Sequence, residues 1–225
     1  MINVSQLEFT GFKGQNIIGT MHKHTPVSDR LAIIFPGYGY TCDRPLLHYS
    51  MQEMLNQGVD VLQVIYEFSN KPGFWQSGEE TRAIWFGSDA KVAMRTVIDT
   101  GNYREFTLIG KSLGSLAIGH IATVMPELEN ARIIIFTPLL TNPKLVKQIL
   151  EIKGKTLLVT GTNDSFHTPE TLKSVRSGRE MTIIEVEDGD HSLEVQGDIP
   201  RSLEVLNRIM KDVIKFLREP ERQEI

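Results

Sequence analysis

Cysteine is almost absent from this 225-residue chain, and charge of one sign does not accumulate in it. Cys42 is the single cysteine, so an intrachain disulfide is excluded. The 24 lysine and arginine residues stand against 28 aspartate and glutamate residues, which gives a net charge of -4. This balance argues against nucleic acid or an anionic membrane as a partner and favours a small molecule. It leaves open whether copies of the chain form a homo-oligomer.

Long apolar runs are missing as well. No uncharged stretch approaches the roughly 20 residues that a membrane-spanning helix needs. Residues 1–6 lack the basic segment and apolar run of a secretory signal, so we expect a cytoplasmic protein. Neither acidic nor cysteine residues cluster with His22 and His24, which we expect to be surface side chains. We therefore expect neither a metal nor another cofactor.

Short apolar runs, rich in β-branched residues, alternate along the chain with longer segments of helical period. This order favours an α/β fold in which helices cover both faces of a mostly parallel sheet. The length and composition of the chain predict one domain over residues 1–225. Six runs are almost continuously apolar, as is typical of strands buried on both faces, and are the predicted inner strands: 31–35, 59–64, 106–109, 132–136, 156–160 and 182–186.

Other segments complete this prediction. Residues 6–10 and 17–22 predict an antiparallel hairpin added to the sheet. Asp43 is expected to cap the first helix and Gly58 to end it. The tail from residue 218 is expected to fray. Helical spacing is present over residues 44–57, 81–99, 113–124, 142–152 and 201–217.

The most informative motif is the G-x-S-x-G run of residues 110–114, which lies between a predicted strand and a predicted helix. A serine on such a sharp turn is strained, and glycine two residues to either side lets the strand and helix pass without Cβ clashes. The hydroxyl of Ser112 is then exposed at the carboxyl end of the strand. The positive end of the helix dipole lies near any negative charge that forms there.

A serine hydroxyl needs a base to take its proton and a third group to orient that base. His191 follows the last predicted strand and is the candidate base, with His167 as the alternative. Asp164 follows the preceding strand and is the candidate acid. Three further carboxylates are alternatives for that role: Asp188, Asp190 and Asp198. Ser112, Asp164 and His191 each follow a predicted strand, where open α/β sheets place their sites.

From residue 31 through the last helix, the chain resembles the α/β-hydrolase family. The elbow at 110–114, the Gly161-Thr162-Asn163-Asp164 turn and the Gly189-Asp190-His191 loop match the three catalytic positions of that family. The resemblance implies an esterase-like mechanism in which Ser112 attacks a carbonyl, an acyl-enzyme forms and His191 activates water. It also implies that the backbone N–H groups of Tyr38 and Leu113 form an oxyanion hole. Pro36 stands where histidine is common in relatives.

Two nucleotide-binding motifs are only partly matched. Gly110-Lys111-Ser112 ends like a phosphate-binding loop, but Glu105 occupies the position of the required first glycine. We therefore expect Lys111 to be a solvated side chain at the elbow. Gly37-Tyr38-Gly39 lacks the third glycine of the dinucleotide fingerprint, because that position is Cys42. Cys42 is expected to be a small packing residue.

The substrate pocket is expected to be open and apolar. Only one short helix fits between the strands ending at residue 136 and beginning at residue 156, so a large lid is excluded. The loop over residues 68–80 carries aromatic side chains that either line the pocket or pack in the core. The candidate pocket residues are Phe74, Trp75, Leu139 and Phe166.

These residues favour a serine hydrolase that cleaves a small carboxylic ester or thioester. A non-catalytic protein that uses the hydrolase scaffold for binding is the alternative from another class. A peptidase or a lysophospholipase with the same three residues is an alternative within the class. The physiological substrate and leaving group do not follow from the sequence.

Overall fold

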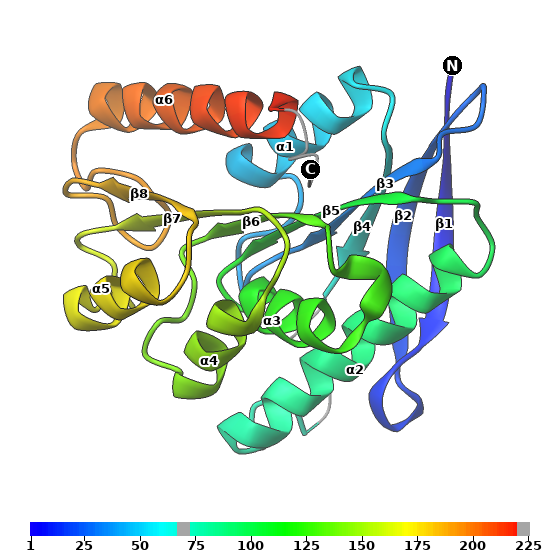
Figure 1. The fold of residues 1–225 in the computed structure, drawn as a ribbon, viewed down its shortest axis with the longest axis horizontal. Coiled ribbons are helices and arrows are strands. Elements are labelled where there is room, and N and C mark those ends of the chain that lie inside the picture. The colour runs from blue at the N-terminus through cyan, green and yellow to red at the C-terminus, as the bar shows by residue number, and fades with distance from the viewer. Residues whose placement is uncertain (67–72, 220–225) are drawn as a thin grey trace.

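The computed structural model describes residues 1–66 and 73–219. Its centre is one eight-stranded sheet with the order β1-β2-β4-β3-β5-β6-β7-β8 (Figure 1). Strands β1 and β2 form the predicted antiparallel hairpin, and β2 also pairs with β4 in the antiparallel sense. The remaining neighbours are parallel. The strands are β1 (Ile2–Thr10), β2 (Asn16–His24), β3 (Arg30–Phe35), β4 (Asp60–Ile65), β5 (Glu105–Lys111), β6 (Arg132–Phe136), β7 (Thr156–Gly161) and β8 (Thr182–Val186).

The six α-helices of the described residues form a layer on each side of this sheet (Figure 1). On one side lie α1 (Pro45–Asn56) and α6 (Ile199–Arg218). On the other side lie α2 (Glu79–Ile98), α3 (Gly114–Val124), α4 (Pro143–Glu151) and α5 (Pro169–Gly178). The predicted α/β arrangement, with helices on both faces, is confirmed.

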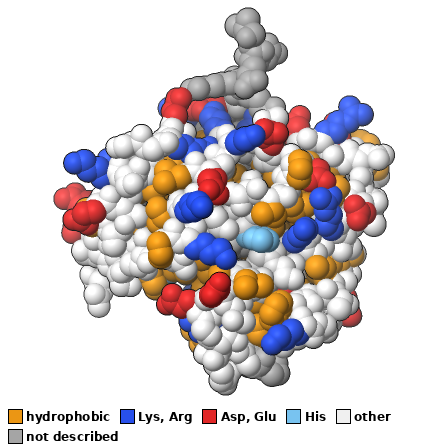
Figure 2. Space-filling view, turned by 60° about the horizontal axis from the view of Figure 1, so that its bottom comes forward, with side chains coloured by type: hydrophobic (Ala, Val, Ile, Leu, Met, Phe, Trp, Pro, Cys, Tyr) orange, Lys and Arg blue, Asp and Glu red, His pale blue; other side chains and the backbone are white. Residues whose placement is uncertain are grey.

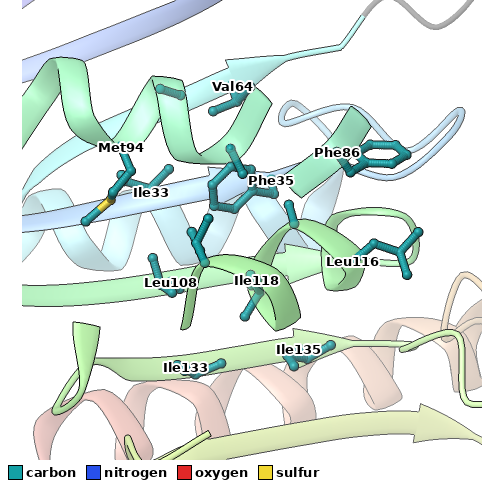
Figure 3. Packing of buried hydrophobic residues seen from close by; sticks show 14 of the residues in the cluster. Ile33, Phe35, Val64, Phe86, Met94, Leu108, Leu116, Ile118, Ile133 and Ile135 are labelled. Carbon is teal, nitrogen blue, oxygen red and sulfur yellow. The ribbon is translucent and has the colours of Figure 1, made fainter. Parts of the chain in front are cut away.

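The sheet is buried because its strands present apolar side chains to both layers. Figure 3 shows the larger cluster, in which Ile33, Leu108 and Ile135 of neighbouring strands pack against Met94 of α2 and Ile118 of α3. The alternate strand residues Ile34, Ile109 and Ile134 face the layer of α1 and α6. This double burial explains why the central strands lack the apolar-polar alternation of a one-sided sheet.

Several local predictions differ from the structure. Helix α1 begins at Pro45 with Arg44 as its N-cap and no side-chain cap, so the capping role predicted for Asp43 is wrong. Strand β8 lies at the edge of the sheet and is mostly half-buried or exposed, unlike the inner strand that was expected. Helix α5 was not predicted, although Pro169 and Glu170 in its first turn are typical of a helix start.

The connection between β6 and β7 contains no large lid. Between Phe136 and Thr156 every residue is described, and the only α-helix there is the nine-residue α4, capped by the side chain of Asn142. The expected fraying from residue 220 onward, and residues 68–72 of the aromatic loop, lie outside the described residues. None of the helices in the described part of the chain combines the length and apolar character needed to cross a membrane.

A core truncation tests this packing. We expect Ile135→Ala to lower the free energy of unfolding by about 2–5 kcal/mol, because the fully buried side chain leaves a cavity between β6 and the α3 layer. Ile84→Ala is the matched control, since Ile84 is 48% exposed on α2. Urea denaturation followed by circular dichroism measures both changes. Equal losses for the two variants would contradict the assigned core.

Candidate active site

The turn between β5 and α3 holds Ser112 in a left-handed backbone conformation, with φ of 53°. A Cβ on Gly110 would lie 2.6 Å from the Ile118 side chain, and a Cβ on Gly114 would collide with the backbone carbonyl of Phe35. Both glycines are therefore required by close approach of the helix to the strands. The turn matches the geometry that the G-x-S-x-G spacing predicted.

Ser112, His191 and Asp164 form one hydrogen-bonded chain. The Ser112 Oγ lies 2.8 Å from Nε2 of His191, and Nδ1 of the same ring lies 2.9 Å from Oδ2 of Asp164. Ser112 and Asp164 are buried, and His191 is half-buried. Three residues separated by 27 to 79 positions along the chain thus meet at the carboxyl edge of the sheet.

Backbone contacts hold the acid turn against the histidine loop. The Asn163 N–H donates to the Gly189 carbonyl at 2.9 Å, and the Asp188 N–H donates to Thr162 Oγ1 at 2.9 Å. A Cβ on Gly161 would collide with the Gly189 carbonyl, so these two backbones are in direct contact. The distance between the carboxylate and the imidazole is therefore fixed mainly by backbone, which is stiffer than a long side chain.

The charge state of Asp164 suits an acceptor of the imidazole N–H. Burial raises the pKa of this carboxyl, but the hydrogen bonds from His191 and from the Phe166 N–H lower it, with help from the charges of His191 and Lys111. The net effect is a pKa below the ordinary aspartate value. The carboxylate is therefore ionised near neutral pH and orients the ring with Nδ1 as the donor.

The alternative acids have other partners. Asp190 Oδ1 accepts the N–H groups of Ser192 and Glu194 and so closes the turn that carries the histidine. Asp188 forms an ion pair with Arg201, and Asp198 caps α6. These three carboxylates stabilise local structure.

The alternative base also lies elsewhere. The His167 side chain is buried, and its Nε2 lies 3.9 Å from Oε2 of Glu185 on the edge strand β8. It forms none of the hydrogen bonds described for Ser112. Within the described residues, His191 is the histidine in contact with the serine hydroxyl.

The loop after β3 lies directly against the serine. A Cβ on Gly37 would be 3.0 Å from the Ser112 Cβ, and the Gly37 and Tyr40 backbones bridge each other across the loop tip. Gly37, the residue before Tyr38, therefore lies against the elbow, and Leu113 is the N-cap residue of α3. The first N–H groups of a helix have no acceptor within that helix, so the Leu113 end of α3 suits an anion.

The candidate pocket residues fall into two groups. Phe74 is only 1% exposed and stacks edge-on with Trp85 and Phe86, which is the packing role that the sequence left open. Trp75 is 46% exposed and meets the ring of the exposed Tyr38 edge to face, with ring centroids 4.9 Å apart.

Leu139 and Phe166 follow the strands that carry the site. Leu139 is buried in the larger cluster, whereas the half-buried Phe166 ring lies 5.1 Å from the His191 ring. Of the four candidates, Phe166 lies beside His191 and Trp75 is exposed next to Tyr38, whereas Phe74 and Leu139 are buried in the core.

Lys111 differs from its prediction. Its side chain is 1% exposed, so the expected solvated lysine is wrong. The ammonium donates to Thr137 Oγ1 at 2.7 Å and to the His191 carbonyl at 2.6 Å. Thr137 has a positive φ of 43° at the end of β6, and no sequence argument identified it. The position of a lysine next to the nucleophile could have indicated this contact, but we expected a solvated side chain there.

The remaining histidines and the cysteine have structural roles. His22 and His24 are half-buried, not surface residues, and contact Gln63 and Asp60 respectively. Cys42 is buried, which raises the pKa of its thiol to about 12, so it is not a reactive thiolate. Within residues 1–66 and 73–219, no three histidine, cysteine or acidic side chains gather as a metal site would require.

The face formed by α2, α3 and α4 carries a cavity of about 260 Å³ beside His120. Burial, together with the charges of Lys144 and Lys91, lowers the pKa of His120. Figure 2 shows acidic and basic side chains interspersed on this side of the molecule, with hydrophobic side chains between them.

Comparisons with known proteins identify the family of the chain. The family model described as an alpha/beta hydrolase domain matches residues 29–218, which is most of the chain. The protein therefore belongs to the α/β-hydrolase family, and this membership supports hydrolase activity. No curated protein sequence matches the chain significantly.

Solved structures share the fold at low sequence identity. A putative α/β hydrolase of unknown function from Agrobacterium tumefaciens, ATU1826, is 16% identical, with a TM-score of 0.74 over 95% of this chain and 94% of its own. The Pyrococcus furiosus esterase Pf2001 is 13% identical, with a TM-score of 0.71 over 96% and 92%. XC6422 from Xanthomonas campestris, described as a serine hydrolase without a lid, is 14% identical, with a TM-score of 0.70 over 96% and 94%.

The close packing of the elbow predicts that an alanine at position 114 is much less tolerated than an alanine at an uncrowded glycine. We expect Gly114→Ala to lower the free energy of unfolding by about 1–3 kcal/mol, because the new methyl group meets the rigid Phe35 carbonyl. Gly78→Ala is the control, since a Cβ there meets nothing within 4 Å and its φ is -65°. Thermal unfolding compares the two variants. A fully stable Gly114→Ala protein would show that the elbow does not need this close approach.

Proposed function

We propose that the protein is a serine hydrolase that cleaves a small carboxylic ester or thioester through an acyl-enzyme on Ser112. The observation that carries the proposal is the hydrogen-bonded chain from Ser112 Oγ to His191 Nε2 and from His191 Nδ1 to Asp164. Its two distances, 2.8 and 2.9 Å, are those of a nucleophile, its base and the group that orients the base. A scaffold used only for binding has no need of this arrangement.

Each proposed step uses a group already in position. His191 Nε2 takes the hydroxyl proton as Ser112 Oγ attacks the substrate carbonyl, and Asp164 stabilises the imidazolium that forms. The imidazolium then gives the proton to the leaving alcohol or thiol, which leaves the acyl group on Ser112. Water attacks the acyl-enzyme, His191 takes its proton, and the acid is released as that proton returns to Ser112.

The negative charge on the carbonyl oxygen requires donors that are already oriented. We assign this role to the backbone N–H groups of Tyr38 and Leu113, which flank the serine from the β3 loop and from the start of α3. The contact of Gly37 with Ser112 supports the assignment, because it brings the β3 loop within reach of the same substrate atom. Since these donors are backbone groups, Pro36 in place of histidine leaves them in position.

The substrate assignment follows from the surroundings of the site. Exposed aromatic surface from Trp75 and Tyr38, together with Phe166 beside the base, favours a modest apolar acyl group. The nine-residue α4 leaves no large lid above the site, so a substrate reaches it from solvent. Relatives in fold include an esterase and a serine hydrolase without a lid, which supports the same class of reaction.

Covalent labelling tests the nucleophile. We expect a fluorophosphonate probe to label the wild-type protein and not Ser112→Ala, because only the activated hydroxyl attacks phosphorus. p-Nitrophenyl acetate and a matched short thioester should be hydrolysed with the same dependence on Ser112. Ser177→Ala is the matched control, since that serine is exposed on α5 and bonds the Lys173 carbonyl, away from the site. A wild-type protein that neither labels nor hydrolyses any ester would indicate a binding protein.

A second variant pair tests the acid. We expect Asp164→Asn to reduce kcat by about 10⁴-fold, because an amide cannot hold the imidazole in the required tautomer and charge state. Asp190→Asn should keep most of the activity, since the remaining side-chain carbonyl still accepts the two turn N–H groups. Steady-state kinetics with p-nitrophenyl acetate separates the two. A comparable loss in both variants would refute the assignment of Asp164.

A further inference from the structure

A buried lysine lies beside the proposed nucleophile and contacts neither the serine hydroxyl nor the imidazole ring in the hydrogen bonds described. The ammonium of Lys111, which is 1% exposed, has three N–H donors and three partners. Two are the oxygens of Thr137, at 2.7 Å, and of the His191 carbonyl, at 2.6 Å. The third is the ring face of Tyr40, whose centroid lies 4.6 Å from Nζ.

These partners come from separate segments at the carboxyl edge of the sheet. Lys111 ends β5, and Thr137 follows β6. His191 lies in the loop after β8, and Tyr40 lies in the loop after β3 that faces the elbow. One side chain therefore joins the segment that carries the serine to the three neighbouring segments, including the one that carries the proposed base.

The contact with His191 is made through its own backbone carbonyl. The imidazole of this residue bonds Ser112 on one side and Asp164 on the other, so the position of its backbone determines whether both bonds form together. The Asp190 carboxylate accepts a hydrogen bond from within the histidine loop and so closes its turn. The Lys111 ammonium, in contrast, donates to the His191 carbonyl and so connects this loop to the elbow.

We propose that Lys111 is a positioning residue that fixes the His191 backbone relative to Ser112 and so holds the imidazole in reach of both its partners. The inference rests on the proposed function for its kinetic consequence. Its structural content, that the ammonium sets the position of the histidine, is independent of which substrate the site accepts. A misplacement of about 1 Å in such a site is enough to reduce the rate roughly 100-fold.

Charge adds a second signature to the geometry. Burial lowers the pKa of Lys111 to about 8, although the nearby carboxylates of Asp164 and Asp190 act to raise it. The ammonium is therefore present below about pH 8 and loses a proton above it. Besides these carboxylates, the titratable groups that face it are His191 and Tyr40, and burial raises the pKa of Tyr40 to about 12. Lys111 thus changes charge near pH 8, well below the pH at which Tyr40 ionises.

Lys111→Met tests the proposal, because methionine fills similar space without donors or charge. We expect kcat for p-nitrophenyl acetate to fall by about 10- to 100-fold, with KM within about twofold of wild type. The wild-type decline of kcat above about pH 8 should be absent from the variant. Lys153→Met, at an exposed lysine paired with Glu129, is the matched control and should retain wild-type kinetics.

A second pair protects the test against misfolding. Thr137→Val keeps Lys111 and removes one of its acceptors, so we expect a smaller loss of kcat, by a few-fold, which Thr137→Ser restores by returning the hydroxyl. Unfolding curves measured on the same samples separate stability from activity. Variants that change stability alone, with wild-type kcat per fluorophosphonate-titrated site and an unchanged pH profile, would overturn the proposal.

A spectroscopic measurement keeps this question apart from the proposed function. We expect the proton between His191 Nδ1 and Asp164 to give a downfield resonance in the NMR spectrum, whether or not any ester is hydrolysed. We expect this resonance to shift or broaden in Lys111→Met and to persist in Lys153→Met. If the wild-type protein hydrolyses nothing, the hydrolase proposal fails. An unchanged resonance in Lys111→Met would then refute the positioning role on its own.

Discussion

The left-handed turn at Ser112 is the constraint on which the site depends. Such a conformation costs a non-glycine residue about 1–3 kcal/mol, so the surrounding structure must hold it in place. The Ser112 N–H donates to the Phe136 carbonyl, and the Ser112 carbonyl accepts the hydroxyl of Ser115 in α3. Helix α3 then passes so close to β3 that only glycine fits at position 114. The buried sheet and helix maintain the strain that holds the Ser112 hydroxyl against His191 Nε2.

Parallel strand order places the partners of this serine at the same edge. Strands β5, β6, β7 and β8 are neighbours, so the loops that follow them are adjacent although they are far apart in sequence. Asp164 and His191 then need only short extensions, and the hydrogen bonds between the two turns, one between backbones and one to the Thr162 hydroxyl, fix their separation. The same order places Thr137, which follows β6, between the Ser112 turn after β5 and the Asp164 turn after β7, and it brings Tyr40 from the loop after β3. A single topology thus supplies both the proposed chemistry and its support.

The sequence predicted those features that depend on one periodicity or one short motif. The six strand segments, the elbow and the chain order of Ser112, Asp164 and His191 all belong to this kind. Features that depend on packing between distant segments were missed. Neighbouring Phe74 and Trp75 point to different environments, and only the position of Trp85 and Phe86 decides which ring is buried. Lys111 looked like a surface residue because its partners lie 26 and 80 residues away.

The partners of Lys111 also explain how a buried cation can lie beside a proposed base without weakening it. A direct bond from the ammonium to Asp164 would compete for the carboxylate that stabilises the imidazolium. The ammonium instead donates to a hydroxyl and a backbone carbonyl, which leaves Asp164 Oδ2 to His191. At longer range its charge helps to keep Asp164 ionised. In the proposed role, Lys111 therefore acts in two ways: its hydrogen bond to the carbonyl positions His191, and its charge lowers the pKa of Asp164.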